Sequence, residues 1–195
     1  MSPMSVLVEV AVDSVASAAA AQAGGAGRIE LCAGLLEGGT TPSAGMIAAC
    51  RAAVTIPLCV LIRPRSGDFL YDEPELAVMR RDIATARDLG ADAIAIGVLR
   101  PDGTVDAERA EALVDAARPL AVTFHRAFDF TRDAAEAFEA VMGLGIDRVL
   151  TSGGGAAALD GVAALPGLRP GAGGRPGGGG GGGGTGGNSA RRRRA

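Results

Sequence analysis

The most constraining feature of this sequence is a regular succession of short apolar runs, each followed by a segment with helix signals. Six such runs recur roughly every 25–30 residues, which is the length of one strand–helix unit. They lack strict alternation of apolar and polar residues, as expected of strands in a sheet covered on both faces. The pattern predicts parallel strands joined by crossover helices. The expected strands are residues 6–12, 28–32, 57–63, 93–97, 120–125 and 147–151.

Parallel strands with crossover helices form either an open doubly wound sheet or a closed barrel. The runs are regularly spaced, and no GxGxxG motif follows the first run, as it would in a dinucleotide-binding sheet. We therefore expect an α/β fold of the TIM-type (β/α) barrel. A complete barrel needs about 200–250 residues, and residues 1–168 supply six of the eight units. The barrel is expected to be incomplete, or truncated, with open edges on its first and sixth strands.

Residues 169–195 differ in composition from the rest of the chain. They consist mostly of Gly, Pro and Arg and hold almost no apolar side chains. Such a segment cannot bury enough surface to offset the entropy of ordering it. We therefore expect a single domain over residues 1–168, followed by a disordered low-complexity tail over residues 169–195. The tail reads either as a natural linker or as a frame-shifted translation of GC-rich DNA.

Charge and cysteine content limit the class of partner and the compartment. The chain has a net charge of -3, but residues 1–168 hold 13 Arg and no Lys against 22 acidic residues. An acidic domain argues against nucleic acid as a specific partner. No apolar run is long enough to span a membrane, which argues against a membrane partner. Three cysteines without paired spacing do not form a disulfide framework, so we expect a cytoplasmic protein.

Polar residues stand at the ends of several expected strands. In a barrel the active face lies at the carboxyl ends of the strands, and a charge inside a buried strand is costly, so each such residue suggests a function. Alternation along the strands can place them on the lumen side of one mouth. They are Glu9, Glu30, Cys32, Arg63, Thr123, His125 and Ser152. We expect Glu30, Arg63 and His125 to line one pocket as catalytic groups, although a structural ion pair between Glu30 and Arg63 would also explain two of them.

Individual side chains suggest roles within this mouth. His125 is the only histidine of the chain, and its unperturbed pKa of about 6.5 would suit a general base at neutral pH. Arg63 and Arg126 can bind an anion through paired hydrogen bonds. Glu9, Thr123 and Arg126 are the residues that we expect to bind the ligand around the catalytic groups.

Five segments of the sequence resemble the CutC copper-homeostasis family: VEVAVDS, AGGAGRIELCAGLLEGGTTPS, IRPRSGDFLY, VTFHRAFDF and DRVLTSG. The similarity runs from about Val6 to Leu165 without a large gap. The resemblance implies a TIM-type barrel, a cytoplasmic protein that is often a homodimer, and a role in copper handling. It also implies cysteine ligands near the first two strands, with Cu(I) as the bound ion.

The sequence departs from the family at one implied copper ligand. The family typically reads EVCVDS where this chain reads EVAVDS, so Ala11 replaces a cysteine and only Cys32 is carried over as a metal ligand. Cu(I) prefers two or more soft donors, so we expect weak copper binding that depends on Cys32. Cys50 and Cys59 read as core residues. Two functions stay open: a copper homeostasis protein of CutC type, and a barrel enzyme or binding protein for a small anionic metabolite.

Overall fold

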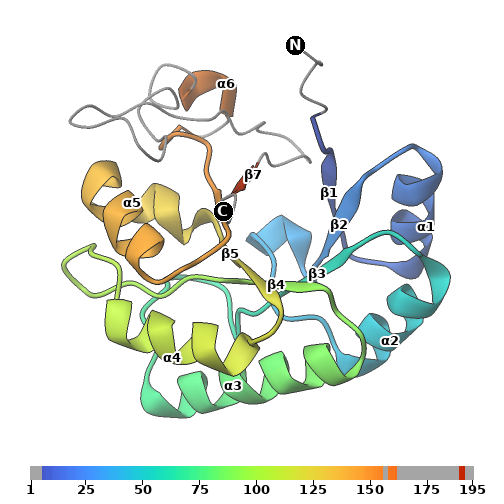
Figure 1. The fold of residues 1–195 in the computed structure, drawn as a ribbon, viewed down its shortest axis with the longest axis horizontal. Coiled ribbons are helices and arrows are strands. Elements are labelled where there is room, and N and C mark those ends of the chain that lie inside the picture. The colour runs from blue at the N-terminus through green and yellow to red at the C-terminus, as the bar shows by residue number, and fades with distance from the viewer. Residues whose placement is uncertain (1–5, 156–157, 162–188, 192–195) are drawn as a thin grey trace.

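The computed structural model describes residues 6–155, 158–161 and 189–191. Six strands form one parallel sheet in the order of the sequence, and a seventh strand pairs with the sixth (Figure 1). The strands are β1 (Glu9–Val12), β2 (Arg28–Leu31), β3 (Leu58–Leu61), β4 (Ala93–Ile96), β5 (Ala121–Phe124), β6 (Arg148–Leu150) and β7 (Ser189–Arg191). Within the described residues β1 does not pair with β6, so the sheet is a curled half-barrel. The parallel sequential order confirms the predicted incomplete barrel.

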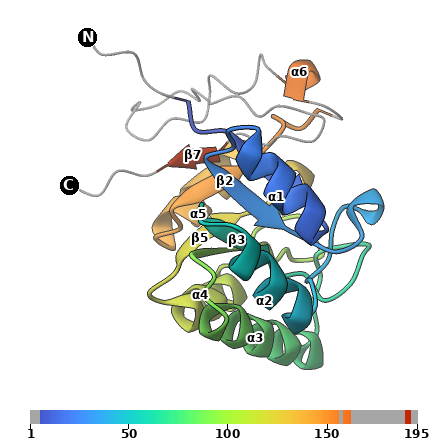
Figure 2. The same ribbon diagram turned by 90° about the vertical axis from the view of Figure 1, so that its right-hand side faces the viewer.

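Helices connect the strands and cover one face of the sheet, as the two ribbon views show (Figures 1 and 2). They are α1 (Val15–Ala23), α2 (Ala44–Ala53), α3 (Glu73–Asp88), α4 (Ala107–Ala117) and α5 (Ala134–Gly143). A short helix, α6 (Ala158–Gly161), lies apart from this layer (Figure 1), and two 3₁₀ turns, η1 (Leu35–Glu37) and η2 (Arg126–Phe130), precede α2 and α5. Each of α1 to α5 begins after a Ser or Asp whose side chain accepts a backbone N–H of the first turn. None of the helices in the described ranges is both long and apolar enough to cross a membrane.

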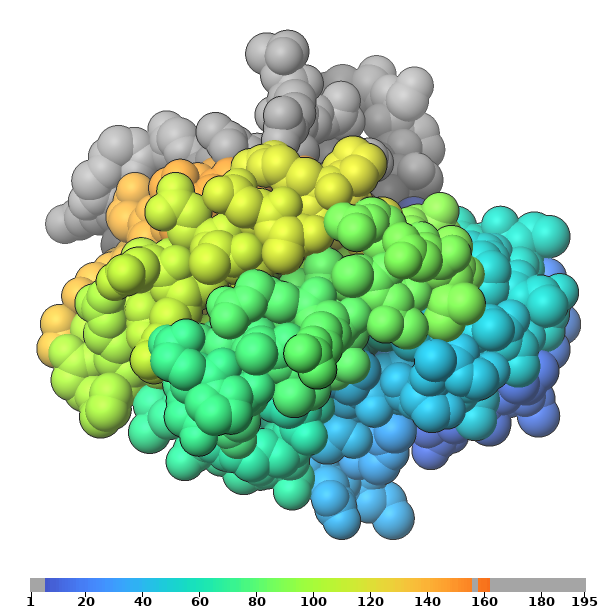
Figure 3. All heavy atoms as spheres, turned by 90° about the horizontal axis from the view of Figure 1, so that it is seen from below, coloured from blue at the N-terminus to red at the C-terminus, as the bar shows by residue number. Residues whose placement is uncertain are grey.

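The two faces of the sheet carry different cores. On β3, Leu58 and Val60 belong to the large core that the sheet shares with the helices, whereas Cys59 and Leu61 belong to a separate small cluster. This alternation assigns the small cluster to the lumen. We call it the inner cluster; its buried members are Cys32, Cys59, Leu61, Ala93 and Ala95. Outside the sheet α3 and α4 contact each other, and their residues pack side by side on the face seen in Figure 3.

Two expectations about the strands are wrong: where the first strand begins, and that the edge of the sixth strand is open. The expected first strand includes residues 6–8, but β1 begins at Glu9 and the three apolar side chains before it are 53–76 % exposed. The open edge expected on the sixth strand is covered, because Ser189–Arg191 pairs antiparallel with β6. These three residues are the described part of the expected tail. A short helix, α6, follows the sixth strand, and most of the residues after it lie outside the described ones.

Candidate functional site

The carboxyl ends of the parallel strands form the mouth of the half-barrel, and buried polar residues gather there. Arg63 comes two residues after β3, His125 directly after β5, and Ser152 two residues after β6. Only 4–6 % of the surface of each of these residues is exposed. Arg63 and His125 lie against the same aromatic ring, because Phe69 is 4.8 Å from the guanidinium carbon of Arg63 and 5.2 Å from the imidazole centroid. The structure therefore brings these two expected site residues together.

The guanidinium of Arg63 is held by main-chain carbonyl groups. Its Nη1 donates to the carbonyl oxygens of Gly39 at 2.8 Å and Glu37 at 3.4 Å, and its Nη2 donates to that of Gly67 at 2.7 Å. The alternative of a Glu30–Arg63 ion pair is therefore not what the structure shows. The Nε of Arg63 is buried and has no hydrogen-bond partner among the described residues. This nitrogen is a fixed donor at the mouth.

His125 is held as a neutral imidazole. Burial lowers its pKa to about 3, and the positive charge of Arg63 acts in the same direction. Its Nδ1 accepts a hydrogen bond of 3.1 Å from the backbone N–H of Ala127. In a neutral ring with Nδ1 as acceptor, the proton is on Nε2. The buried Nε2 has no partner in the described part of the chain, so it is a donor and does not fit the expected general base.

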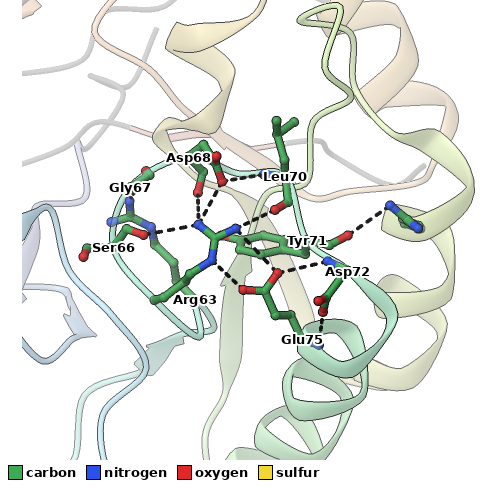
Figure 4. Close-up of polar contacts among 10 residues, drawn as sticks. Arg63, Ser66, Gly67, Asp68, Leu70, Tyr71, Asp72 and Glu75 are labelled. Atoms are coloured by element: carbon green, nitrogen blue, oxygen red, sulfur yellow. Dashed lines mark hydrogen bonds and ion pairs between the residues drawn. The ribbon is translucent and has the colours of Figure 1, made fainter.

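The loop after β3 is fixed over this mouth by Arg65. Its guanidinium donates to Glu75 at 2.5 Å, to Asp68 at 2.8 Å and to the carbonyl oxygen of Leu70 at 2.6 Å, and these three partners are labelled in Figure 4. These hydrogen bonds from Arg65 lower the pKa of both carboxyl groups. The loop carries Phe69, so Arg65 positions the ring that lies between Arg63 and His125.

Glu30 and Thr123 face the lumen at different depths. The register aligns Glu30 with Cys59, which is four residues before Arg63, so Glu30 lies deeper than the mouth. Burial raises the pKa of Glu30 to about 7; the charge of Glu9 adds to this effect and that of Arg28 opposes it. Thr123 lies two residues before His125, and its buried Oγ1 has no hydrogen-bond partner among the residues described.

Cys32 directly follows β2 and belongs to the inner cluster. Burial raises the pKa of its thiol far above the usual value, and the charges of Glu30, Asp13 and Glu9 add to this effect. The other two thiols, Cys50 and Cys59, are also buried and free, as expected of core residues. In the described ranges no three His, Cys, Asp or Glu side chains are grouped so as to hold a metal ion. A metal ion at this site would therefore be held by fewer than three such side chains from the described residues.

The expectation that Glu9 lies at the mouth is wrong. Glu9 begins β1, at the opposite end of the sheet, and its carboxylate accepts two hydrogen bonds from Arg28 at 2.6 and 2.5 Å. Both side chains are less than 10 % exposed. The register aligns Glu9 with Arg28, so this buried ion pair joins the first residues of β1 and β2 and has a structural role.

Sequence reasoning missed Asp129, which joins η2 to the end of β6. Its carboxylate accepts from the hydroxyl of Thr151 at 2.5 Å, from the backbone N–H of Ser152 at 3.0 Å and from Nε of Arg126 at 3.1 Å. Burial alone would raise its pKa, but these hydrogen bonds outweigh burial and lower it. Arg126 also donates to Ser152 Oγ at 3.0 Å, so this expected ligand-binding residue is engaged within the protein. The acid stands in the segment VTFHRAFDF, which already marked this region.

Comparison with known proteins agrees with the resemblance. The CutC family model matches residues 6–183. The copper homeostasis protein cutC homologs of Mus musculus and Homo sapiens are 54 % and 53 % identical to this chain over 156 residues, which are 80 % of it. A CutC family protein of Xanthomonas campestris is 53 % identical over 83 % of the chain. The chain spans 57 % of the length of the mouse and human relatives.

Solved structures support the same assignment. The structure of CutC from Streptococcus agalactiae matches with a TM-score of 0.80 and 31 % identity, over 84 % of this chain and 81 % of that one. A phosphonopyruvate hydrolase matches with a TM-score of 0.59 at 18 % identity, over 81 % of this chain and 62 % of that one, and shows a shared fold alone. On the family match and the identities together, this chain belongs to the CutC family of copper homeostasis proteins.

Proposed function

We propose that this chain is a cytoplasmic copper homeostasis protein that binds Cu(I) through Cys32. The observation that carries the proposal is a buried free thiol on the lumen side of the sheet, in a chain that is 53–54 % identical to proteins named for copper homeostasis. Cu(I) selects soft sulfur ligands. The reducing cytoplasm would keep all three thiols in the form that binds the ion.

The electrostatic surroundings of Cys32 define how this binding would occur. Its raised pKa means that the thiol is protonated at neutral pH, so Cu(I) must displace the proton. The affinity should therefore increase with pH. Glu30 is a hard oxygen donor and a poor ligand for Cu(I), although its charge favours a cation nearby.

Competition against a coloured Cu(I) chelator under reducing conditions tests this proposal. Three proteins are compared: wild type, Cys32→Ser and Ala11→Cys. We expect Cys32→Ser to lose most of the Cu(I) affinity. Ala11→Cys should gain affinity, because position 11 is aligned with Glu30 and lies on the strand next to Cys32. Equal affinities for wild type and Cys32→Ser would contradict the proposal.

A second candidate function is the binding of a small anion at the mouth, as a binding protein or as an enzyme. The observation that favours it is the set of buried donors without partners among the described residues: Nε of Arg63, Oγ1 of Thr123 and Nε2 of His125. Leaving buried donors unsatisfied is costly, so such groups call for a ligand with oxygen acceptors. A small carboxylate or phosphate has the required chemistry.

The test of this second candidate uses the imidazole NMR signal of His125, the only histidine. Inorganic phosphate and oxalate are titrated separately into wild type, Arg63→Met and Arg118→Met. Arg118 is a matched control, because it is about half exposed and pairs with Asp115 on the surface. We expect a saturable shift in wild type and Arg118→Met that is lost in Arg63→Met. The same shift in all three proteins, or none in wild type, would exclude this candidate.

A further inference from the structure

We infer that Cys59 supplies a second sulfur, and that Cys32 and Cys59 together bind one Cu(I) ion on the lumen face of β2 and β3. This inference rests on the proposed copper function and adds a ligand to its site. Both cysteines belong to the inner cluster, and both are free. Two thiolates in line with the ion satisfy Cu(I), which accepts two-coordinate sulfur sites.

The strand register sets the separation of the two thiols. Cys59 is aligned with Glu30, and Cys32 lies two residues further along the chain than Glu30. With strands about 4.8 Å apart and a rise of about 3.3 Å per residue, the two Cα atoms lie on a diagonal of about 8 Å. A disulfide needs Cα atoms within about 7 Å. An ion with metal–sulfur bonds of about 2.3 Å can bridge the longer separation.

The surroundings of the two thiols suit a soft ion. The rest of the inner cluster is apolar and largely small, with Ala93 and Ala95 lining the lumen beside Leu61. Apolar walls of this kind exclude water and supply no hard oxygen donor of their own.

Binding of the ion changes the charge of this site. Binding releases one proton from each thiol and leaves a copper bis-thiolate with a net charge of −1. Burial raises the pKa of Cys59, and the charges of Glu30 and Glu9 add to this effect, while those of Arg28 and Arg148 oppose it. Both thiols are therefore protonated before the ion binds, as at Cys32 alone.

The third cysteine provides a control within the same chain. Cys50 is fully buried, but it lies on α2 and packs in the core between the sheet and the helices. Like Cys59 it is a buried free thiol, but it lies on the helix side of the sheet and Cys59 lies on the lumen side. A copper effect caused by any buried thiol would therefore appear for Cys50 as well.

The experiment compares the Cu(I) affinity of wild type, Cys32→Ser, Cys59→Ser, Cys59→Val and Cys50→Ser by chelator competition. X-ray absorption at the copper edge of the wild-type complex is a second measurement that needs no variant. We expect one ion bound by two sulfur atoms. Loss of Cys32 or Cys59 should weaken binding by roughly tenfold or more, since one sulfur is a poor site for Cu(I). Cys50→Ser should bind as wild type does.

The outcomes separate this inference from the proposed function. Loss of affinity in Cys32→Ser, with wild-type affinity in both Cys59 variants and one sulfur in the absorption spectrum, would overturn the role of Cys59 and leave copper binding at Cys32. Equal affinity in all five proteins would overturn both. Cys59→Val keeps an apolar side chain of similar size in the cluster, so agreement between the two Cys59 variants excludes a folding defect as the cause.

Discussion

The imidazole of His125 lies directly on the backbone of Gly97, the residue that follows β4. A Cβ built on Gly97 would stand 2.5 Å from Nδ1 of His125 and 2.7 Å from Cβ of Ala127. Real Cβ atoms do not approach other atoms this closely, so the glycine is required by the ring that covers it. The position of His125 at the mouth thus depends on the absence of a side chain on the neighbouring strand.

Gly97→Ala should destabilise the protein by about 1–3 kcal/mol, because the added methyl group must displace His125 from a packed site. Gly143→Ala on α5 is the matched control, since a Cβ added there would have no neighbour within 4 Å among the described residues. That change should be neutral or stabilising by up to about 1 kcal/mol. Urea unfolding of the three proteins measures both effects. Equal stability of Gly97→Ala and wild type would show that the ring is free to move.

The buried pair of Glu9 and Arg28 should be important for stability and unimportant for ligand binding. Glu9→Gln leaves a buried guanidinium without its carboxylate, which costs about 3–5 kcal/mol. Glu136→Gln removes a half-exposed partner of Arg132 and should cost about 0.5 kcal/mol or less. Chemical unfolding gives both values. A loss for Glu9→Gln as small as that for the control would contradict the structural role.

The raised pKa of Glu30 predicts a stability that falls as pH rises. The unfolded carboxyl titrates near 4.5 and the folded one at about 7, so the folded state binds more protons between these values. Stability should decrease from about pH 4.5 to pH 7, and Glu30→Gln should remove this decrease. Glu111→Gln, at an exposed position on α4, should keep it. Unfolding curves at several pH values test this, and a pH profile unchanged in Glu30→Gln would refute it.

The sequence predicts the strand order well, because each apolar run and each helix cap is a local signal. It predicts the site less well. Alternation places Cys59 on the lumen face, but its alignment with Glu30 depends on the pairing of β2 with β3, which only the fold supplies. The run before Glu9 resembles a strand, yet pairing starts where Arg28 faces Glu9.

Asp129 shows a second limit of sequence reasoning. It lies four residues after His125, inside η2, where no strand alternation applies. Its partners Thr151 and Ser152 follow β6 and are more than 20 residues away in the sequence. A carboxylate that links two loops from within a turn leaves no periodic pattern in the sequence, so only the three-dimensional contacts reveal it.

Asp129→Asn should remove hydrogen bonds that join η2 to the end of β6 and so lower the stability of the protein. The carboxylate accepts from Thr151, Ser152, Gly154 and Arg126, and an amide cannot accept from all of them. We expect a loss of about 2 kcal/mol or more near neutral pH. Asp88→Asn, at an exposed side chain, is the control and should change little.

Acid unfolding gives an independent check on Asp129. Its pKa is lowered in the folded state, so its contribution to stability is present above the usual aspartate range and is lost as pH falls below about 4. Asp129→Asn should flatten this part of the acid-unfolding profile. An unchanged profile would mean that the carboxylate contributes no pH-dependent stability.

His125 should remain neutral, with its proton on Nε2, across the physiological pH range. Its pKa is lowered to about 3 by burial and by Arg63, while the unfolded imidazole titrates near 6.5. The unfolded state therefore binds the extra proton first, and stability should fall as pH drops below 6.5.

Nitrogen-15 NMR of the imidazole measures the protonation state of both ring nitrogens directly, because His125 is the only histidine of the chain. We expect a constant signal from a protonated Nε2 and an unprotonated Nδ1 between pH 5 and 8. Arg63→Met removes the nearby positive charge and should raise the pKa of His125, whereas Arg118→Met should not. An imidazole that titrates near pH 6.5 in the folded wild type would contradict both the donor role and the buried position.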